Sequence, residues 1–185
     1  TYSPAYNAAD LAELTKISEH ITFNNPQQIE RWKNDYNQEI TIDSSEIGLR
    51  INPEIALGET EKYDPSQPHS RLGFPISQLA PDHFQHLSGI HFHNLCEQGF
   101  DALQRTWEKV EPVIAPHFDS LKWINLGGGH HITREDYDRE ALVDFLKNLK
   151  ARSGCEIYLE PGEAVALDAG ILVGEILDVF DNGMP

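Results

Sequence analysis

The sequence predicts an α/β fold of the (β/α) TIM-type barrel class, and two patterns along the chain support this prediction. Short apolar strands alternate with helical segments, which implies parallel strands joined by helical crossovers. Within each strand, one set of alternating side chains is apolar and the other is polar or small. A sheet buried on both faces would show continuous apolar runs, whereas a barrel can place polar groups at strand ends around a site.

The predicted elements follow one another in a regular order. Strands are expected at residues 20–23, 47–52, 89–95, 122–126 and 156–160. Helices are expected at residues 26–36, 75–87, 100–111 and 133–152. Residues 54–69 are rich in Pro, Gly and charge, and they are expected to form a surface loop. The apolar strand side chains should face the helices; they are Ile21, Phe23, Ile47, Leu49, Ile51, Ile90, Phe92, Ile124, Leu126, Ile157 and Leu159.

The predicted strands are too few to close a barrel, which typically has eight strands and about 250 residues. The chain has 185 residues, so we expect residues 1–169 to form part of a barrel whose first strands are missing. Residues 1–4 are interpreted as the tail of an earlier strand. The apolar pattern of residues 170–180 predicts a further strand. We therefore expect residues 170–185 to begin a strand that leads into or out of a C-terminal β domain.

Composition and charge indicate a globular protein that binds neither nucleic acids nor membranes. Apolar residues make up 39% of the chain and charged residues 24%, as in folded domains. The net charge of −16 disfavours nucleic acids and anionic membrane surfaces. It would attract a cationic substrate, although it also fits a surface that is charged only for solubility. No apolar run is long enough for a membrane span, and Cys96 and Cys155 fit no disulfide framework, so we expect a cytoplasmic protein with reduced thiols.

Three consecutive glycines after a predicted strand are the strongest local signal in the sequence. Because they lack Cβ atoms, Gly127, Gly128 and Gly129 allow backbone N–H groups to close on a phosphate. A helix that starts at Thr133, capped together with Asp136, would direct its positive end toward the same anion. The alternative is a tight turn between a strand and a helix with no ligand.

Polar residues gather at the predicted carboxyl ends of several strands, where barrel enzymes place their chemistry. They are Arg50, His93, the three glycines, and the sequence Glu160-Pro161-Gly162-Glu163. Taken singly, each has a simpler explanation. Glu160 could be an ordinary salt-bridge partner, His93 a core histidine, Arg50 a counter-charge for inward carboxylates, and Cys96 a small buried apolar residue.

These residues resemble the motifs of the alanine racemase-fold decarboxylases that use pyridoxal 5'-phosphate. The family shares a strand ending in a ring-stacking histidine, a Gly-Gly-Gly phosphate loop and a Glu-Pro-Gly strand end. His93, residues 127–129 and residues 160–162 match these motifs in the same order. Over nearly the whole chain, the sequence is most similar to the carboxynorspermidine (carboxyspermidine) decarboxylases. Four segments carry this similarity: HFHNLCE at 91–97, LGGGHHIT at 126–133, EPGEAV at 160–165 and SRLG at 70–73. The joint order outweighs the simpler explanations for His93, Glu160 and the glycines, but not for Arg50 or Cys96.

The resemblance implies decarboxylation of carboxynorspermidine or carboxyspermidine to norspermidine or spermidine in polyamine biosynthesis, with pyridoxal phosphate as cofactor. The cofactor ring accepts the electrons left by CO2 when its nitrogen is protonated. In this interpretation Glu160 pairs with the ring nitrogen and His93 stacks on the ring. Gly127, Gly128, Gly129 and Gly162 hold the phosphate, and Arg71 approaches the ring or substrate. Glu163, Glu97 and Cys96 lie on the substrate side, and no metal is assigned. Glu163 stands where related decarboxylases usually have an arginine.

The family binds its cofactor through a lysine on an early barrel strand, and the chain has no lysine in such a setting. Lys122 is the only lysine in a predicted strand, but it shares the helix-facing parity and lies at the wrong strand end. The cofactor lysine is therefore expected upstream of Thr1. The resemblance also implies a homodimer with sites shared across its interface.

Three other functions remain open. Diaminopimelate decarboxylase is the nearest competitor within the cofactor class. A metal-dependent barrel hydrolase could use His91, His93, His130, His131 and Glu160 as zinc or iron ligands, but it has no use for three glycines. A non-catalytic relative that binds partners is supported only by the missing lysine.

Overall fold

The computed structural model describes residues 1–36, 45–58, 60–181 and 183 of the chain. It contains a parallel sheet in the order β1-β2-β4-β5-β6, formed by His20–Phe23, Glu46–Asn52, Gly89–His91, Trp123–Asn125 and Glu156–Tyr158. The two-residue strand β3 (Phe74–Pro75) pairs with the end of β2. Every strand pair is parallel, which confirms the predicted α/β class with helical crossovers. Among the described residues the sheet runs from β1 to β6 without closing on itself, so the barrel stays a prediction.

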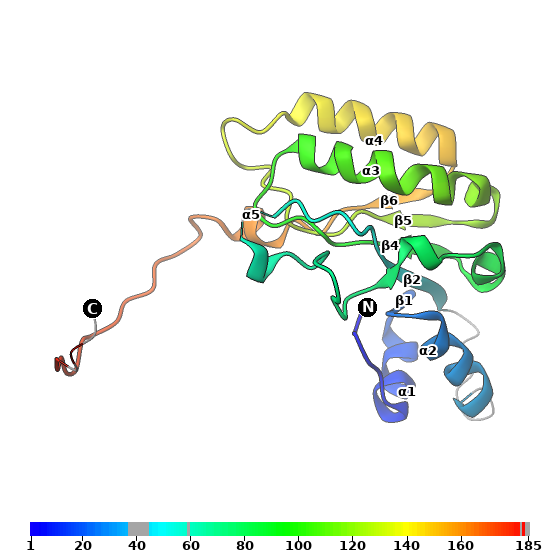
Figure 1. Cartoon of the computed structure of the whole chain (residues 1–185), viewed down its shortest axis with the longest axis horizontal. Helices are drawn as coiled ribbons and strands as arrows, with labels where there is room; N and C mark the ends of the chain where they lie inside the picture. Colours follow the sequence, from blue (N-terminus) through cyan, green and yellow to red (C-terminus); the bar gives the residue numbers. More distant parts are fainter. Residues whose placement is uncertain (37–44, 59, 182, 184–185) are drawn as a thin grey trace.

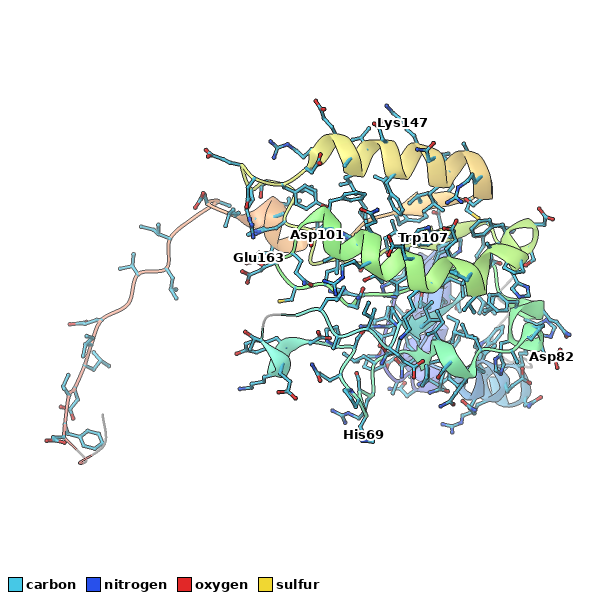
Figure 2. All side chains as sticks on the ribbon, turned by 45° about the horizontal axis from the view of Figure 1, so that its top comes forward. His69, Asp82, Asp101, Trp107, Lys147 and Glu163 are labelled. Carbon is cyan, nitrogen blue, oxygen red and sulfur yellow. The ribbon has the colours of Figure 1, made fainter. Side chains whose placement is uncertain are left out.

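The helices lie against the sheet in two groups (Figure 1). Helices α3 (Phe100–Ile114) and α4 (Arg139–Ser153) lie side by side over the part of the sheet formed by β4, β5 and β6. Helices α1 (Ala8–Ile17) and α2 (Pro26–Arg31) lie at the opposite end, near β1. Trp107 of α3 is buried in this packing, whereas Lys147 of α4 points into solvent (Figure 2). No helix in the described part of the chain is long and apolar enough to span a membrane.

The predicted alternation of strand side chains is confirmed. The core row Phe23, Leu49, Ile90 and Ile124 is matched in register across β1, β2, β4 and β5, and each side chain is at most 1% exposed. On the other face, Arg50, His91 and Asn125 form a polar row in the same way. One row lower, Gly48 and Gly89 leave room for the ring of Trp123. The polar face of the sheet is therefore built for close contacts rather than for a helix layer.

Two predicted helices are wrong in their extent. Residues 75–87 form β3 and the short 3-10 helices Ile76–Gln78 and Pro81–His86. The α conformation is disfavoured for the residue that precedes a proline, so Pro81 interrupts the expected helix. The helix expected from residue 133 begins only at Arg139. Asp138 caps it by accepting a hydrogen bond from Ala141 N at 2.9 Å, whereas the side chain of Asp136 is paired with Arg134.

Other boundaries also differ from the prediction. Strands β4, β5 and β6 are shorter than expected, since their pairing stops at His91, Asn125 and Tyr158. Helix α1, capped by Asn7, and the short helix α5 (Gly162–Ala166) were not predicted. The π-helix Trp32–Tyr36 extends α2, so the helix expected at residues 26–36 is present in two forms. A 3-10 turn, Glu61–Tyr63, lies in the predicted surface loop, of which residue 59 lies outside the described residues.

The two ends of the chain bear on the remaining expectations. Tyr2 forms a parallel bridge with Thr22 of β1, and Thr1 O accepts the N–H of Thr22 at 2.8 Å, as expected for the tail of a strand. Residues 170–181 form no strand in this structure, and their large apolar side chains are exposed. The apolar residues of this segment have a high propensity for β-strands, but the segment pairs with no strand among the described residues. Residues 182, 184 and 185 of the predicted segment lie outside the described residues.

Candidate active site

The candidate site lies just beyond the carboxyl ends of β4, β5 and β6, on the polar face of the sheet. His93 stands two residues after His91, and Glu160 stands two residues after Tyr158, so both continue the polar alternation of their strands. The three predicted parts of the site, His93, Glu160 and the glycine turn, therefore come together. Gly128 lies between them, because a Cβ placed there would be 2.5 Å from Glu160 O and 3.0 Å from His93 Cε1.

The Glu160 carboxylate is held from several sides. Asn125 donates a hydrogen bond from Nδ2 to Glu160 Oε1 at 2.8 Å. His91 Nε2 lies 3.7 Å from Oε2, beyond hydrogen-bond range, and His93 Nδ1 lies 3.9 Å from the same oxygen. The Glu160 side chain is 47% exposed, and that of His93 is 39% exposed. One carboxylate and one imidazole thus remain accessible above a buried polar floor.

The charge states of these groups follow from their surroundings. The nearby His91 and the Asn125 hydrogen bond lower the pKa of Glu160 to about 2, although burial opposes the shift. Burial, assisted by the charge of Arg50, lowers the pKa of His93 to about 4. Burial also lowers the pKa of His91, with Glu160 acting in the opposite direction. At neutral pH the site therefore holds an ionised carboxylate beside two neutral imidazoles.

Each position of the glycine turn excludes a side chain for a specific reason. Gly127 and Gly129 have φ values of 72° and 81°, and added Cβ atoms would collide with Phe92 O and Leu95 O. In the described part of the chain, the N–H groups of Gly128 and Gly129 have no hydrogen-bond acceptor. The N–H of Gly127 is bound to Asn125 Oδ1 at 2.9 Å. The turn thus offers two free backbone donors beside His93 and Glu160, which is a fit for an anion.

Two expected anion-binding features are corrected by the structure. Because α4 begins at Arg139, its positive end does not follow the glycine turn directly, and residues between them form turns. The N–H of Gly162 donates to Glu160 O at 2.8 Å, so this predicted phosphate donor is engaged within the chain. Of the predicted phosphate donors, Gly128 and Gly129 are therefore the two whose N–H groups stay free in the described part of the chain.

The residues expected on the substrate side occupy a crevice next to the turn. Glu97 and Glu163 line this small crevice together with Gly129 and Pro161. Glu163 belongs to the first turn of α5, at the end of the molecule where the C-terminal segment departs (Figure 2). Cys96 is exposed, but partial desolvation of its thiol, together with the charges of Glu97 and Glu163, raises the pKa of this group. Both predicted carboxylates thus reach the same place, beside a protonated thiol.

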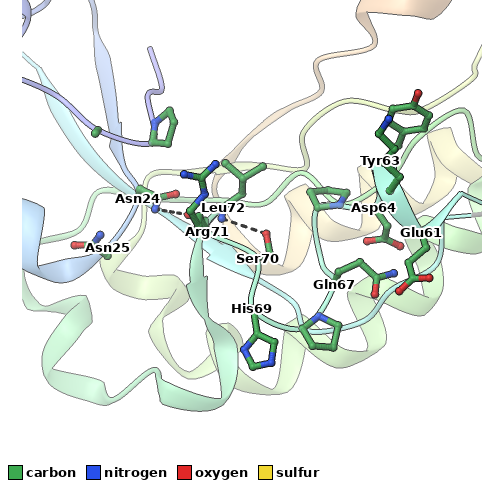
Figure 3. Close-up of a pocket in the computed structure, with 15 residues that line it drawn as sticks. Asn24, Asn25, Glu61, Tyr63, Asp64, Gln67, His69, Ser70, Arg71 and Leu72 are labelled. Atoms are coloured by element: carbon green, nitrogen blue, oxygen red, sulfur yellow. Dashed lines mark hydrogen bonds between the residues drawn. The ribbon is translucent and has the colours of Figure 1, made fainter.

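Arg71 lies in a different, larger pocket near the ends of β1 and β2. Among the described residues it forms no hydrogen bond or ion pair with His93 or Glu160. This pocket has a volume of about 850 Å³, and Arg71 lines it with Asn24, Asp64 and His69 (Figure 3). Asn24 Nδ2 donates to Arg71 O at 2.8 Å, which fixes the loop but leaves the guanidinium exposed. The structure therefore places Arg71 at the same rim of the sheet but does not bring it into the Glu160 cluster.

Three residues to which the sequence assigned no role in the site support it. Arg50 is 5% exposed, and its NH2 group donates to His93 O at 3.0 Å, so it fixes the loop that presents His93. Tyr2 lies over Arg50, with its ring centroid 4.6 Å from the guanidinium carbon, and it meets the His91 ring edge-on. Asn125 was visible in the sequence only as one polar strand residue before the glycines. The sequence showed that Asn125 lies on the polar face of its strand. It did not show that its side chain would bind both Glu160 and Gly127.

A metal centre is possible by geometry but disfavoured by charge. The ligand atoms of His91, His93 and Glu160 all lie within 4.8 Å of one another. His130 does not join them, since its Nε2 contacts Leu126 O at 3.2 Å. The guanidinium of Arg50 acts on His93, so a positive charge already faces the cluster. A further cation would be repelled by this group.

Comparisons with known proteins agree with these motifs. No protein-family profile matches the chain. The carboxynorspermidine/carboxyspermidine decarboxylase of Campylobacter jejuni is 36% identical over 182 residues, which are 98% of this chain and 46% of that protein. The carboxyaminopropylagmatine decarboxylase of Synechocystis is 32% identical over the same shares of the two chains. The chain thus spans about half the length of these relatives.

A solved structure shows the same arrangement of elements. It is the carboxynorspermidine decarboxylase of Campylobacter jejuni in complex with norspermidine, with a TM-score of 0.80 and 34% identity. The alignment covers 99% of this chain and 46% of the other. These findings confirm the resemblance identified from the motifs, and the parallel α/β fold is that of this group of decarboxylases.

Proposed function

We propose that the protein decarboxylates carboxynorspermidine or carboxyspermidine with pyridoxal 5'-phosphate as cofactor, in polyamine biosynthesis. The observation that carries this proposal is the ionised Glu160 carboxylate, held by Asn125 beside His93 and the glycine turn. A ring with a basic nitrogen, a flat face and a phosphate matches this combination of a carboxylate, an accessible imidazole and free backbone donors. The similarity to decarboxylases along almost the whole chain supports the same conclusion.

Each residue near the carboxylate has a separate part in holding the cofactor. When bound, pyridoxal phosphate supplies an electron sink for decarboxylation. Glu160 stays ionised at neutral pH and so favours a proton on the ring nitrogen. His93, neutral at this pH, offers its exposed face for stacking. Gly128 and Gly129 would offer their free N–H groups to the phosphate, and Gly127 and Gly162 shape the turn on either side.

The substrate side is defined by negative charge. A carboxylated polyamine carries several ammonium groups, and Glu163 and Glu97 share one crevice beside Gly129. We assign the distal amine to Glu163, with Glu97 as its neighbour and the protonated Cys96 alongside. Arg71 is assigned to the substrate or ring from the neighbouring pocket. The net charge of −16 supports attraction of such a polycation.

The proposal extends to the architecture of the whole enzyme. Residues 1–169 form part of a cofactor-binding (β/α) barrel, and residues 170–185 begin a strand that leads into or out of a C-terminal β domain. The cofactor lysine lies on a barrel strand outside these 185 residues. The enzyme is a homodimer in the cytoplasm, where the thiols of Cys96 and Cys155 stay free. The parallel α/β fold shared with a carboxynorspermidine decarboxylase supports the barrel assignment.

A substrate panel on the intact enzyme tests the activity. The enzyme is loaded with pyridoxal phosphate and offered carboxynorspermidine, carboxyspermidine, carboxyaminopropylagmatine and diaminopimelate, and CO2 release and the amine product are measured. We expect the two carboxylated triamines to have the highest kcat/KM. Preferential turnover of diaminopimelate would replace the proposal by its nearest competitor. Activity that depends on an added metal and not on the cofactor would refute it.

A further inference from the structure

The side chain of Asn125 uses both ends of its amide within the candidate site. Its Nδ2 donates to Glu160 Oε1 at 2.8 Å, and its Oδ1 accepts the N–H of Gly127 at 2.9 Å. A carboxylate only accepts hydrogen bonds, and a backbone N–H only donates them. The amide therefore satisfies both partners in one orientation only, because a flipped amide would place oxygen against the carboxylate.

The backbone of Asn125 is fixed independently of its side chain. Asn125 ends strand β5 and is paired in register with His91 of β4 and Tyr158 of β6. Its carbonyl accepts the N–H of Phe92 at 3.1 Å, and the next residue, Leu126, donates to Tyr158 O at 2.9 Å. A short side chain on a rigid strand end holds its partners more tightly than a loop residue does.

The two partners of Asn125 are assigned to two different groups of the proposed cofactor. Glu160 is assigned to the ring nitrogen, and Gly127 opens the phosphate turn. A second link joins them through the backbone, because Glu160 N donates to Gly127 O at 2.8 Å. The carboxylate and the turn are therefore connected twice, once through the main chain and once through the Asn125 amide.

We propose that Asn125 is a positioning residue that sets the Glu160 carboxylate and the phosphate turn as one unit, so that a single side chain positions the groups that would hold both the ring nitrogen and the phosphate. This inference rests on the proposed function for the identity of the ligand. The link that Asn125 makes between Glu160 and Gly127 does not depend on the proposed function, because it can be measured without cofactor. Asn125 touches neither ring nor substrate in this assignment and acts only through Glu160 and Gly127.

The chain contains a matched control at the end of β2. Asn52 also ends a parallel strand, and its Oδ1 accepts the N–H of the residue two positions later, Glu54, at 2.8 Å. It has the same local turn as Asn125 and no contact with Glu160. Asn52→Ala therefore reports the effect of losing such a turn without disturbing the carboxylate.

Two variants separate the two bonds of Asn125. Asn125→Asp keeps an oxygen for the Gly127 N–H but replaces the donor to Glu160 with a negative charge of nearly the same shape. Asn125→Ala removes both hydrogen bonds, the one to Glu160 and the one from Gly127. In the cofactor-free protein, we expect Asn125→Ala to raise the pKa of Glu160 by about one unit and Asn125→Asp to raise it further. Amide exchange at Gly127 should accelerate roughly three- to tenfold in Asn125→Ala alone.

All variants are made in the intact enzyme, which includes the cofactor lysine. The measurements are NMR titration of the Glu160 carboxyl carbon and hydrogen exchange at the Gly127 amide, followed by titration of each variant with pyridoxal phosphate. We expect Asn125→Ala to bind the cofactor about tenfold more weakly and Asn52→Ala to bind it as the unmodified protein does. An unchanged Glu160 titration in both Asn125 variants would overturn the inference. Equal acceleration of Gly127 exchange in Asn125→Asp and Asn125→Ala would also overturn it.

The design distinguishes failure of the inference from failure of the proposed function. If the unmodified protein binds no pyridoxal phosphate while the Glu160 and Gly127 readouts change as expected, the linkage stands and the cofactor assignment fails. If the cofactor binds normally to every variant while those readouts stay fixed, the proposed function stands and the role of Asn125 fails. Asn125→Asp, which preserves shape, keeps the test valid if Asn125→Ala does not fold.

Discussion

Replacing Gly128 with alanine tests whether the glycine turn is shaped for close packing against the site. The added Cβ would lie 2.5 Å from Glu160 O, 3.0 Å from His93 Cε1 and 3.4 Å from His93 Nε2, whereas ordinary contact begins at 3.4 Å. The Glu160 carbonyl would have to move by about 0.9 Å, the difference between those limits. That carbonyl accepts the Gly162 N–H at 2.8 Å, so it is not free to move.

The expected cost of Gly128→Ala is about 1–3 kcal/mol of unfolding free energy, as for other overpacked sites. Gly154→Ala is the control, because Gly154 caps α4 at φ 70° and an added Cβ there meets no atom within 4 Å. It should cost about 1 kcal/mol through backbone strain alone. Urea unfolding measures both costs, and titration with pyridoxal phosphate measures the consequence for the site.

Only Gly128→Ala should weaken cofactor binding, by about tenfold or more, because only it displaces Glu160 and His93. Gly154→Ala should bind the cofactor normally despite its lower stability. The reasoning is refuted if Gly128→Ala matches the unmodified protein in both stability and cofactor affinity. It is refuted equally if Gly154→Ala loses as much cofactor affinity as Gly128→Ala.

Four other predictions follow from the site and its supports. In the intact enzyme, Glu160→Gln should retain the cofactor while kcat falls by orders of magnitude, and unchanged turnover would remove Glu160 from the mechanism. Glu163→Gln should raise KM for carboxynorspermidine far more than it changes cofactor affinity; collapse of cofactor binding with unchanged KM would instead assign Glu163 to the phosphate site. Because burial lowers the pKa values of His91 and His93, the folded state binds fewer protons than the unfolded state. The stability that these two neutral histidines contribute is therefore fully present above about pH 6.5 and should be lost as pH falls toward 4. Urea midpoints that do not decrease between pH 7 and pH 5 would contradict this. Trp123→Ala should cost about 3–5 kcal/mol in urea unfolding, since the ring is 2% exposed and fills the space above two strand glycines; a cost below about 1 kcal/mol would show that it is not packed there.

Local sequence patterns were sufficient for the strands and for the composition of the site. Alternation of apolar and polar residues identified the buried row through Leu49 and Ile90, because a strand places successive side chains on opposite faces whatever its partners are. The same parity placed His93 and Glu160 on the polar face. The glycine turn was also recognisable, since three consecutive residues without Cβ atoms are a local property of the chain.

Helix boundaries depended on contacts that the local pattern does not contain. Thr133 and Asp136 formed a plausible cap in sequence, but Asp136 pairs with Arg134 and Asp138 caps α4 instead. Likewise, Asn7 starts a helix whose apolar face is completed only by packing against the sheet, with Leu11 at 2% exposure. Competing caps of similar strength are decided by tertiary packing.

Interactions across the site were determined by the tertiary structure alone. Asn125 and Glu160 are 35 positions apart, and Tyr2 reaches Arg50 across the sheet, so no local pattern could connect them. Their contacts exist because parallel pairing aligns the strand ends in register, which converts separate polar residues into neighbours. The sequence by itself determined which residues face the polar side of the sheet. Only the assembled sheet decided which of them touch, since strand register is a property of the pairing and not of any single strand.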